Sequence, residues 1–305
     1  MTLTRTRTLE IPDTPSDTVI MNPFKLMAHE IHSDKVALFS LILMSAIVLT
    51  VYIWSAFIDQ SLALFVDLRN INRAPSAAHW LGTDLGGRDM LHLTILSART
   101  SFNIAFVITF FGMLIGVPLG LASGFYGGKI DNTIMRVLDF YAMIPAIMLI
   151  IVFIGAIGEY TALTFTMILV VLWSWQGTTR LVRIKALQQS NLEYIQASKT
   201  LGSPNIVIMF REMLPNLVSI VTSNLVLNLA ANMGIETGLT FLGFGLPFPT
   251  PSLGRILANA QNPEIMVHRS WQWLPAAVII LTMMLCINFV GQAINRSTDA
   301  KKRAI

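Results

Sequence analysis

The sequence predicts an all-α membrane protein with six transmembrane helices, and three observations support this prediction. Of the 305 residues, 54% are hydrophobic and only 12% are charged, values unlike those of ordinary water-soluble chains. The apolar residues gather in six stretches, most of them near the length of about twenty residues that a helix needs to cross a bilayer. The single cysteine, Cys286, excludes a disulfide framework and a metal site built on cysteines.

The six stretches divide the chain into membrane and non-membrane segments. They are Val36–Ile58, Phe102–Leu121, Ile134–Ile157, Thr161–Trp175, Leu217–Ile235 and Leu274–Ile294. The fourth is the shortest, and Gln176 can extend it because a side-chain amide can bond to the helix backbone or to a neighbouring helix. We therefore expect a tail with an interfacial helix over 1–35, a first transmembrane helix over 36–58, an external loop over 59–100, a transmembrane core over 101–296 and a second tail over 297–305.

The basic residues indicate how the chain is oriented. Counted by alternate loops, fifteen of the 21 Lys and Arg residues lie on the side that holds both termini, and six lie on the other. Translocated loops are poor in Lys and Arg, so both termini are expected in the cytoplasm. The net charge of +4 is explained by this topology and by anionic lipid, without nucleic acid.

The N-terminal segment has two parts. Residues 1–20 are rich in Thr, Asp and Pro, which predicts a disordered tail. After Pro23, the apolar residues Phe24, Met27 and Ile31 fall on one helical face. This pattern favours a helix that lies in the membrane interface, with a plain spacer as the alternative.

A polar segment, residues 178–213, separates the fourth and fifth stretches. Helix-forming residues lead up to Gly202, the residue type best suited to the left-handed turn after a helix C-terminus. Ser203 and Pro204 then favour the start of another helix. We expect a short helix, a sharp corner and a second helix.

This segment also has an apolar side, formed by Tyr194, Ile195 and Leu201. A solvated connector has no need of such a side, so the residues favour a docking element over an ordinary surface loop.

The polar segment resembles the coupling loop of ABC importer permeases. The family pattern is Glu-Ala-Ala, three residues, Gly, nine residues, Ile, one residue and Leu-Pro. The corresponding residues here are Gln196, Ala197, Ser198, Gly202, Glu212, Leu214 and Pro215, of which Gln196, Ser198 and Glu212 depart from the pattern. The resemblance implies that the chain is coupled to an ATPase through Glu193, Tyr194, Gln196, Ala197, Ser198, Gly202 and Pro215.

Two further segments resemble signatures of the peptide and nickel branch of these permeases. The first is His79–Asp89 with Ser97–Ser101, and the second is Phe241–Pro247 with Pro249–Gly254. The resemblance covers about Trp80 to Arg296 and points to a C-type permease subunit of an oligopeptide importer, with the type I ABC importer architecture. Dipeptides or nickel complexes are the alternative cargo in the same branch.

The resemblance also implies partners. These are a second homologous permease subunit, two cytoplasmic ATP-binding subunits that hold ATP and Mg, and an extracellular or periplasmic peptide-binding protein, all beside membrane lipid. Gly127-Gly128-Lys129 is followed by Ile130, which does not match a phosphate-binding loop. We therefore expect no cofactor on this chain and no enzymatic activity of its own. A membrane-embedded peptidase would need a nucleophile or metal motif, and we find neither in the sequence.

Few ionisable residues fall within the apolar stretches. Glu236, at the outer end of the fifth, either lines the translocation path or marks the membrane interface. An ion-coupled secondary transporter would need such a site and usually an inverted repeat, and the sequence offers only Glu236. Arg136 and Asp139 are spaced to pair on one helix face.

The second apolar stretch carries a glycine at every fourth position. Gly112, Gly116, Gly120 and Gly124 predict a smooth ridge against which another helix can pack closely, with pore lining as the alternative.

Overall fold

A computed structural model describes residues 23–303 of the chain, and the side chains of residues 27–296. The expected tail over residues 1–20 lies outside the described residues. Within residues 23–303 the regular structure is helical, and the extended pairing there is a single bridge between Thr83 and Asp89. The predicted all-α class is therefore confirmed.

Four helical runs have the length and composition to cross a membrane. They are α2 (Lys35–Phe57), α4 (Met90–Tyr126), the run of α10 (Asn205–Val207), η3 (Ile208–Met213) and α11 (Leu214–Phe241), and the apolar part of α14 (Leu274–Arg303). A bent pair of helices gives a fifth span if it is counted as one. Within residues 23–303 the expected count of six is thus not reached on these criteria.

The third expected stretch is broken in the structure. It divides into α5 (Gly128–Met143) and α6 (Ala146–Ile157), which are bent by 79°. Pro145 accounts for the break, because proline lacks an N–H and disfavours helical geometry in the residue before it. Ile144 accordingly adopts extended angles, with φ −101° and ψ 126°. The prediction of one continuous helix over Ile134–Ile157 is wrong for this reason.

The fourth expected stretch does not end where its apolar residues end. It begins as α7 (Ala162–Leu169), widens into the π-helical turn η2 (Val170–Ser174) and runs on into the more polar α8 (Gln176–Ser190). The Thr161 hydroxyl caps α7 by accepting the N–H of Thr164 at 3.2 Å. This segment therefore does not form a separate long apolar helix.

Residues 90–100 of the expected external loop belong to α4. The Asp89 carboxylate accepts the N–H groups of Leu91 and His92 at 2.9 and 3.2 Å, which starts the helix well before the apolar stretch. Met90 and Ala98 are fully buried, so this first part of α4 is held by packing. The rest of the loop contains α3 (Gln60–Ala63) and η1 (Leu68–Asn70).

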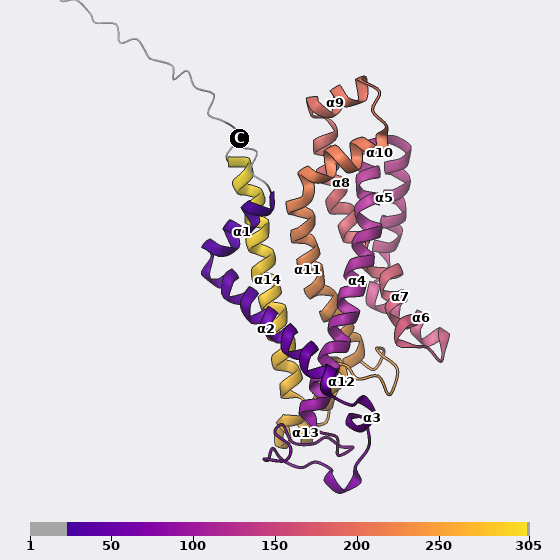
Figure 1. Ribbon diagram of the computed structural model, residues 1–305. Helices are drawn as coiled ribbons and strands as arrows, with labels where there is room; N and C mark the ends of the chain where they lie inside the picture. Colours follow the sequence, from indigo (N-terminus) through magenta and orange to yellow (C-terminus); the bar gives the residue numbers. More distant parts are fainter. Residues whose placement is uncertain (1–22, 304–305) are drawn as a thin grey trace, which may run out of the picture.

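The glycine ridge of α4 is a packing surface, as predicted. A Cβ atom at any of the four positions would lie within 2.9 Å of an atom of η2 or α8. The facing residues, in order along the ridge, are Ser174, Thr178, Val182 and Ala186. Because these glycines lack side chains, α4 and α8 approach closely and lie side by side (Figure 1).

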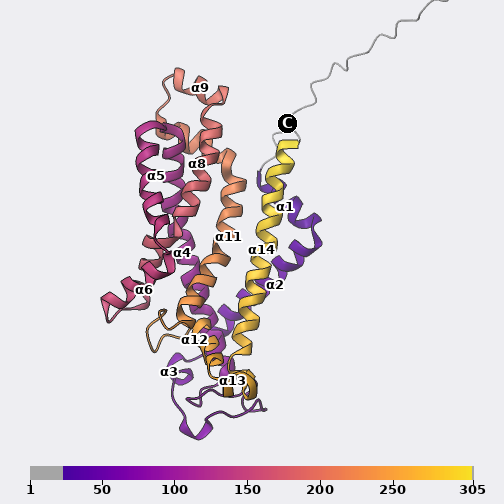
Figure 2. The same ribbon diagram turned by 180° about the vertical axis from the view of Figure 1, so that it is seen from behind.

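The two ends of the bundle differ in content. α9 (Glu193–Thr200) lies at the same end as the C-terminal part of α14, whereas α3, α12 (Leu253–Ala258) and α13 (Pro263–His268) lie at the opposite end (Figures 1 and 2). The short turns η4 (Asn259–Gln261) and η5 (Ser270–Gln272) flank α13. We call these the α9 end and the α13 end.

The helix expected before the first span is present as α1 (Pro23–Ser33). Met27 of this helix packs against Val290 and Ile294 of α14, and Ile31 lies against the same cluster. At the junction with α2, the Asp34 carboxylate caps the new helix and pairs with Arg296. α1 is therefore fastened to α14.

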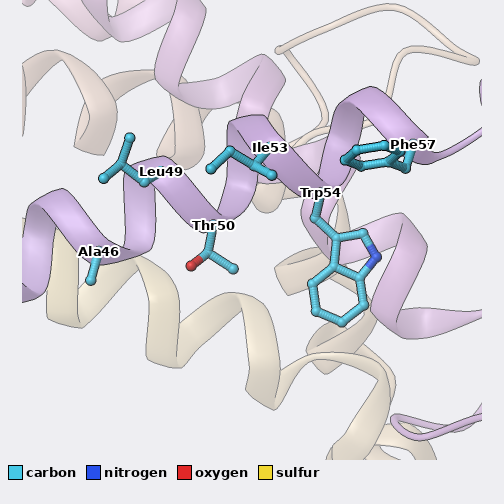
Figure 3. Close-up of a pocket in the computed structure, with 6 residues that line it drawn as sticks. All are labelled: Ala46, Leu49, Thr50, Ile53, Trp54 and Phe57. Atoms are coloured by element: carbon cyan, nitrogen blue, oxygen red, sulfur yellow. The ribbon is translucent and has the colours of Figure 1, made fainter.

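α2 lies at the edge of the bundle and leaves one face open. A shallow groove on that face is lined by residues of α2 alone, and their side chains project from the helix as Figure 3 shows. The lining residues are Ala46, Leu49, Thr50, Ile53, Trp54 and Phe57. Mostly apolar side chains on an exposed membrane-length helix suit contact with lipid hydrocarbon.

Candidate functional site

The predicted corner at Gly202 is present in the structure. α9 ends at Thr200, Leu201 caps it, and Gly202 follows at φ +80°, in the left-handed region. The N–H of Ser203 bonds to the Ser198 carbonyl at 3.1 Å, and the N–H of Gly202 bonds to the Lys199 carbonyl at 3.1 Å. These two bonds form a Schellman motif, which satisfies carbonyls that the helix end would otherwise leave open.

The second helix of the corner is short and then widens. Its N-cap is Pro204, the second of the two residues expected to start it. In η3 the N–H of Leu214 bonds to the Met209 carbonyl, which is five residues back. Pro215 follows and has no backbone N–H. A regular α-helix could therefore form no hydrogen bond from position 215 either, and the wider turn before it loses no bond there.

A single buried side chain fixes α9 to the rest of the chain. Ile195 is 0% exposed and belongs to a cluster with Val182 of α8 and with Ile208 and Met213 of η3. The cluster continues down α4 through Leu121. The apolar side predicted from Ile195 is therefore turned toward the protein itself.

Polar contacts reinforce this attachment. The Gln196 side chain donates to the Ser190 carbonyl at 2.7 Å, which ties α9 to the end of α8. The Tyr194 hydroxyl receives a hydrogen bond from Asn216 at 3.1 Å and donates to Gln189 at 3.4 Å. Partial burial raises the pKa of Tyr194, so this hydroxyl keeps its proton at neutral pH.

The outward side of the corner is apolar and open. Leu201 is 85% exposed, and Leu192, Ile206 and Phe210 are exposed as well. Apolar side chains gathered on the exposed side of a corner at the end of the bundle are typical of a protein-binding surface. We call these four residues the corner surface.

The expected coupling residues do not all lie together. Glu193, Tyr194, Gln196 and Ala197 are exposed on α9, Ser198 is half-buried there, and Gly202 forms the corner. Pro215 lies instead in the first turn of α11, beyond η3. The structure thus gathers six of the seven residues on α9 and its corner.

An ion pair beneath α9 has no counterpart in our sequence analysis. Arg183 of α8 makes two contacts with the Asp131 carboxylate of α5, at 2.5 and 2.6 Å, and Ser123 of α4 donates to the same carboxylate at 2.5 Å. Three helices therefore meet at one carboxylate. The sequence separation of 52 residues between Arg183 and Asp131 explains why no local pattern revealed it.

Asp139 does not pair with Arg136 as expected. Its carboxylate contacts Arg180 of α8 at 2.8 Å, and both side chains of this ion pair are exposed. Close to α9, the Lys199 ammonium lies 4.3 Å from the centre of the Phe125 ring, a cation–π contact with the end of α4.

At the α13 end, the two outer signatures lie against each other. The N–H of Leu253, in the second signature, donates to the Ser101 hydroxyl of the first at 3.2 Å. Ser97, Pro251 and Arg255 line one small cavity of about 40 Å³. His79 contacts the Asp89 carboxylate at 2.8 Å, which gives this histidine a structural partner.

Glu236 lies inside this junction and is 0% exposed. Its carboxylate accepts the hydroxyls of Thr240 at 3.1 Å and Thr237 at 3.4 Å, and the Ser101 and Ser252 side chains lie near it. Ser252 in turn caps α12. In this conformation Glu236 is enclosed where α4, α11 and α12 meet and does not line an open path.

Side-chain amides on α11 are a further feature that the sequence analysis did not single out. Asn224, Asn228 and Asn232 recur every fourth residue, and Asn232 donates to Thr109 of α4 at 2.9 Å. Asn224 and Asn228 both bond to Thr178 of α8. The available signal was this regular spacing of amides within an apolar stretch.

Comparisons with known proteins identify the family. Residues 116–303 match the family described as binding-protein-dependent transport system inner membrane component. The chain is 44% identical over 274 residues to the oligopeptide transport system permease protein OppC of Lactococcus lactis subsp. cremoris (strain SK11), covering 90% of this chain and 93% of that protein. It is 34% identical over 233 residues to the dipeptide transport system permease protein DppC of Bacillus subtilis (strain 168), covering 76% and 72%.

The fold has a solved counterpart as well. A chain of the MetNI methionine ABC transporter in an inward-facing conformation aligns with a TM-score of 0.56 and 21% identity, covering 68% of this chain and 97% of that chain. The likeness confirms the predicted type I importer permease architecture. The chain therefore belongs to the family of binding-protein-dependent transport system inner membrane components, the membrane permease subunits of ABC transporters.

Proposed function

We propose that this chain is the transmembrane subunit of an ATP-driven importer that translocates oligopeptides across the cell membrane. The cargo assignment is supported by identities of 44% and 43% to two OppC proteins over 90% of the chain. The dipeptide permease DppC matches less of the chain at 34% identity, so we favour oligopeptides over dipeptides or nickel complexes.

The observation on which we base the coupling mechanism is the attachment of α9. This short helix is held from below by the buried side chain of Ile195, while Leu201 and the rest of the corner surface stay open. A partner that binds the open side can therefore push on α9, and the buried cluster would pass the displacement to α8 and η3. Coupling of this kind requires no covalent chemistry from this chain.

The proposal assigns each remaining task to a partner. Two cytoplasmic ATP-binding subunits would bind ATP and Mg and press on the corner surface. A second homologous permease subunit would complete the path, and an extracellular or periplasmic peptide-binding protein would deliver the cargo. With both termini and α9 in the cytoplasm, α3, α12 and α13 would face the delivering protein.

Two substitutions at Gly202 test the coupling role. Its φ of +80° strains a β-branched residue, whereas asparagine tolerates this region, and no atom lies within 4 Å of where a Cβ would stand. A difference between Gly202→Val and Gly202→Asn would thus reflect the backbone conformation at the corner and not a steric clash of the new side chain. The assay is ATP-dependent uptake of a labelled oligopeptide by vesicles that contain the complete importer.

We expect Gly202→Val to lower uptake and to raise the ATP hydrolysed per peptide, with Gly202→Asn closer to the unmodified protein. Both variants should reach the membrane in normal amounts, which immunoblotting of membrane fractions checks. Equal uptake by the two variants at the unmodified level would argue against α9 as the coupling element.

A further inference from the structure

Two side-chain amides lie together near the middle of the membrane-length run of α11. The Asn224 carbonyl oxygen accepts hydrogen bonds from the Thr178 hydroxyl at 2.9 Å and from the Asn228 amide at 3.0 Å. The Asn228 amide also donates to the Thr178 hydroxyl at 3.0 Å. Thr178 is 1% exposed, so both amides are held from the buried side in fixed orientations.

This network uses only half of the capacity of each amide. The Asn224 Nδ2 group and the Asn228 Oδ1 atom make no hydrogen bond within the described residues, and neither is among the buried side-chain atoms that lack a partner. Both residues are half-buried. The two free polar atoms therefore reach the surface of α11. Asn232, one turn further on, is instead buried and bonded to Thr109.

Amide atoms without a hydrogen bond near the middle of a membrane-length helix need a polar partner or water. A donor or acceptor that faces lipid hydrocarbon without a partner costs several kcal/mol, so polar groups at membrane depth generally face a neighbouring helix or a water-filled path. Residues four apart lie next to each other on a helix, which places the free N–H donor of Asn224 beside the free C=O acceptor of Asn228. A peptide group likewise carries one N–H donor and one C=O acceptor, so it can bond to both free amide atoms.

We propose that Asn224 and Asn228 form a binding site for the main chain of the peptide during translocation. The peptide N–H would donate to the Asn228 carbonyl, and the peptide C=O would accept from the Asn224 amide. Such a site reads the backbone alone, which suits cargo of varied sequence. This inference rests on the proposed function, because it requires that the cargo be a peptide.

Accessibility of introduced cysteines is the first test. Cys286 is the only cysteine of the chain and is buried, so Cys286→Ala gives a clean background. Asn224→Cys and Asn228→Cys are compared with Leu225→Cys, whose position is 39% exposed but points to another side of the helix. A water-soluble maleimide is applied to the complete importer, with and without ATP and binding protein loaded with a six-residue peptide.

We expect the cysteines at positions 224 and 228 to react and to be protected while peptide is being transported, and the cysteine at 225 to react slowly throughout. Two results would overturn the site. One is no reaction at 224 and 228, as expected if the second permease covers them. The other is reaction that the peptide does not slow.

Backbone N-methylation of the cargo is the second test. A methyl group removes the N–H that Asn228 would accept, and one net hydrogen bond of about 0.5–1.5 kcal/mol corresponds to about a 2- to 12-fold difference. With binding protein saturated by either peptide, the unmodified importer should transport the parent peptide faster by a factor in this range. The Asn228→Leu variant should bring the two rates close together.

Leu225→Ala is the matched control, because this side chain points to another side of α11 and its loss leaves both amides and Thr178 in place. This variant should still distinguish the two peptides. If Asn228→Leu keeps the full preference for the parent peptide, the site is wrong while the peptide importer stands. If the unmodified importer carries no peptide at all, the proposed function itself fails.

Discussion

The side-chain amide of Asn216 donates a hydrogen bond of 3.1 Å to the hydroxyl of Tyr194. The same hydroxyl also reaches Gln189 of α8, so one oxygen links α8, α9 and the first turn of α11. Together with the bond from Gln196 to the Ser190 carbonyl, this hydroxyl supplies the polar contacts of α9 beside the apolar cluster around Ile195. These contacts form the joint that would carry force from the corner surface.

Removal of this hydroxyl should loosen α9. Tyr194→Phe is expected to cost about 1 kcal/mol of local stability, the usual net value of a hydrogen bond. The effect should appear as faster amide hydrogen exchange over 193–200 in the purified importer. Tyr126→Phe is the control, because the Tyr126 side chain contacts Phe125 through its ring alone within the described residues. Equal exchange in both variants would contradict the role of Tyr194.

The glycine ridge gives a prediction about stability. In Gly120→Ala the new Cβ would lie 2.7 Å from the Thr179 carbonyl oxygen and 2.7 Å from Val182, and the backbone atom cannot move aside cheaply. We expect a loss of about 1–3 kcal/mol, the usual cost of overpacking, seen as a lower melting temperature.

The matched glycine is Gly238 of α11, where a Cβ would meet nothing within 4 Å. Gly238→Ala should be neutral or stabilising by up to about 1 kcal/mol, because alanine has the higher helix propensity. A Gly120→Ala protein as stable as Gly238→Ala would show that the close contact of α4 with α8 is not needed.

Two arginines of α8 should respond differently to replacement by lysine. Two nitrogens of Arg183 contact the partly buried Asp131 carboxylate, whereas Arg180 forms an exposed ion pair with Asp139. Lysine cannot reproduce a two-nitrogen contact. Arg183→Lys is expected to lower the free energy of unfolding by about 1–3 kcal/mol and Arg180→Lys by about 0–1 kcal/mol.

Thermal unfolding of the two variants, measured side by side at the same salt concentration, checks this difference. If both arginines tolerate lysine equally, Asp131 does not hold α4, α5 and α8 together in the way that its contacts indicate.

Replacement of Glu236 should disturb the α13 end. In Glu236→Leu the buried hydroxyls of Thr237 and Thr240 lose their shared acceptor, at a cost of about 1–3 kcal/mol for a buried group left unsatisfied. Glu236→Gln keeps one carbonyl acceptor and should be milder. The two variants are compared by limited proteolysis of α12 and its flanking loops. If the Leu variant resists cleavage as well as the Gln variant, Glu236 does not hold this junction together.

Much of the fold follows from patterns that are local in the sequence. The apolar stretch Val36–Ile58 corresponds to α2 within one residue at each end, and the corner at Gly202 forms as its sequence predicts. Both depend on neighbouring residues: a continuous apolar run in the first case, and a helix that ends at a residue without a side chain in the second.

The errors have two kinds of cause. Some signals were local but outweighed, such as Pro145 within an apolar stretch and the Asp89 cap ahead of α4. Hydropathy alone overlooks both, because it does not record a missing N–H or a capping carboxylate.

Other features depend on the folded chain. The contact of Arg183 with Asp131 joins residues 52 apart, and the burial of Glu236 depends on α4 and α12 closing over it. No pattern within one helix predicts such contacts. The free amide atoms of Asn224 and Asn228 likewise became visible only once Thr178 was seen to hold the other halves.

Site-specific crosslinking from the corner surface tests the central claim most directly. Leu201→Cys in a Cys286→Ala background places a reactive group at a position whose side chain is 85% exposed. In native membranes that contain the complete importer, we expect a crosslink to an ATP-binding subunit, with a yield that changes when ATP is added. Labelling of this cysteine from outside the cell, or crosslinks that never reach an ATP-binding subunit, would contradict it.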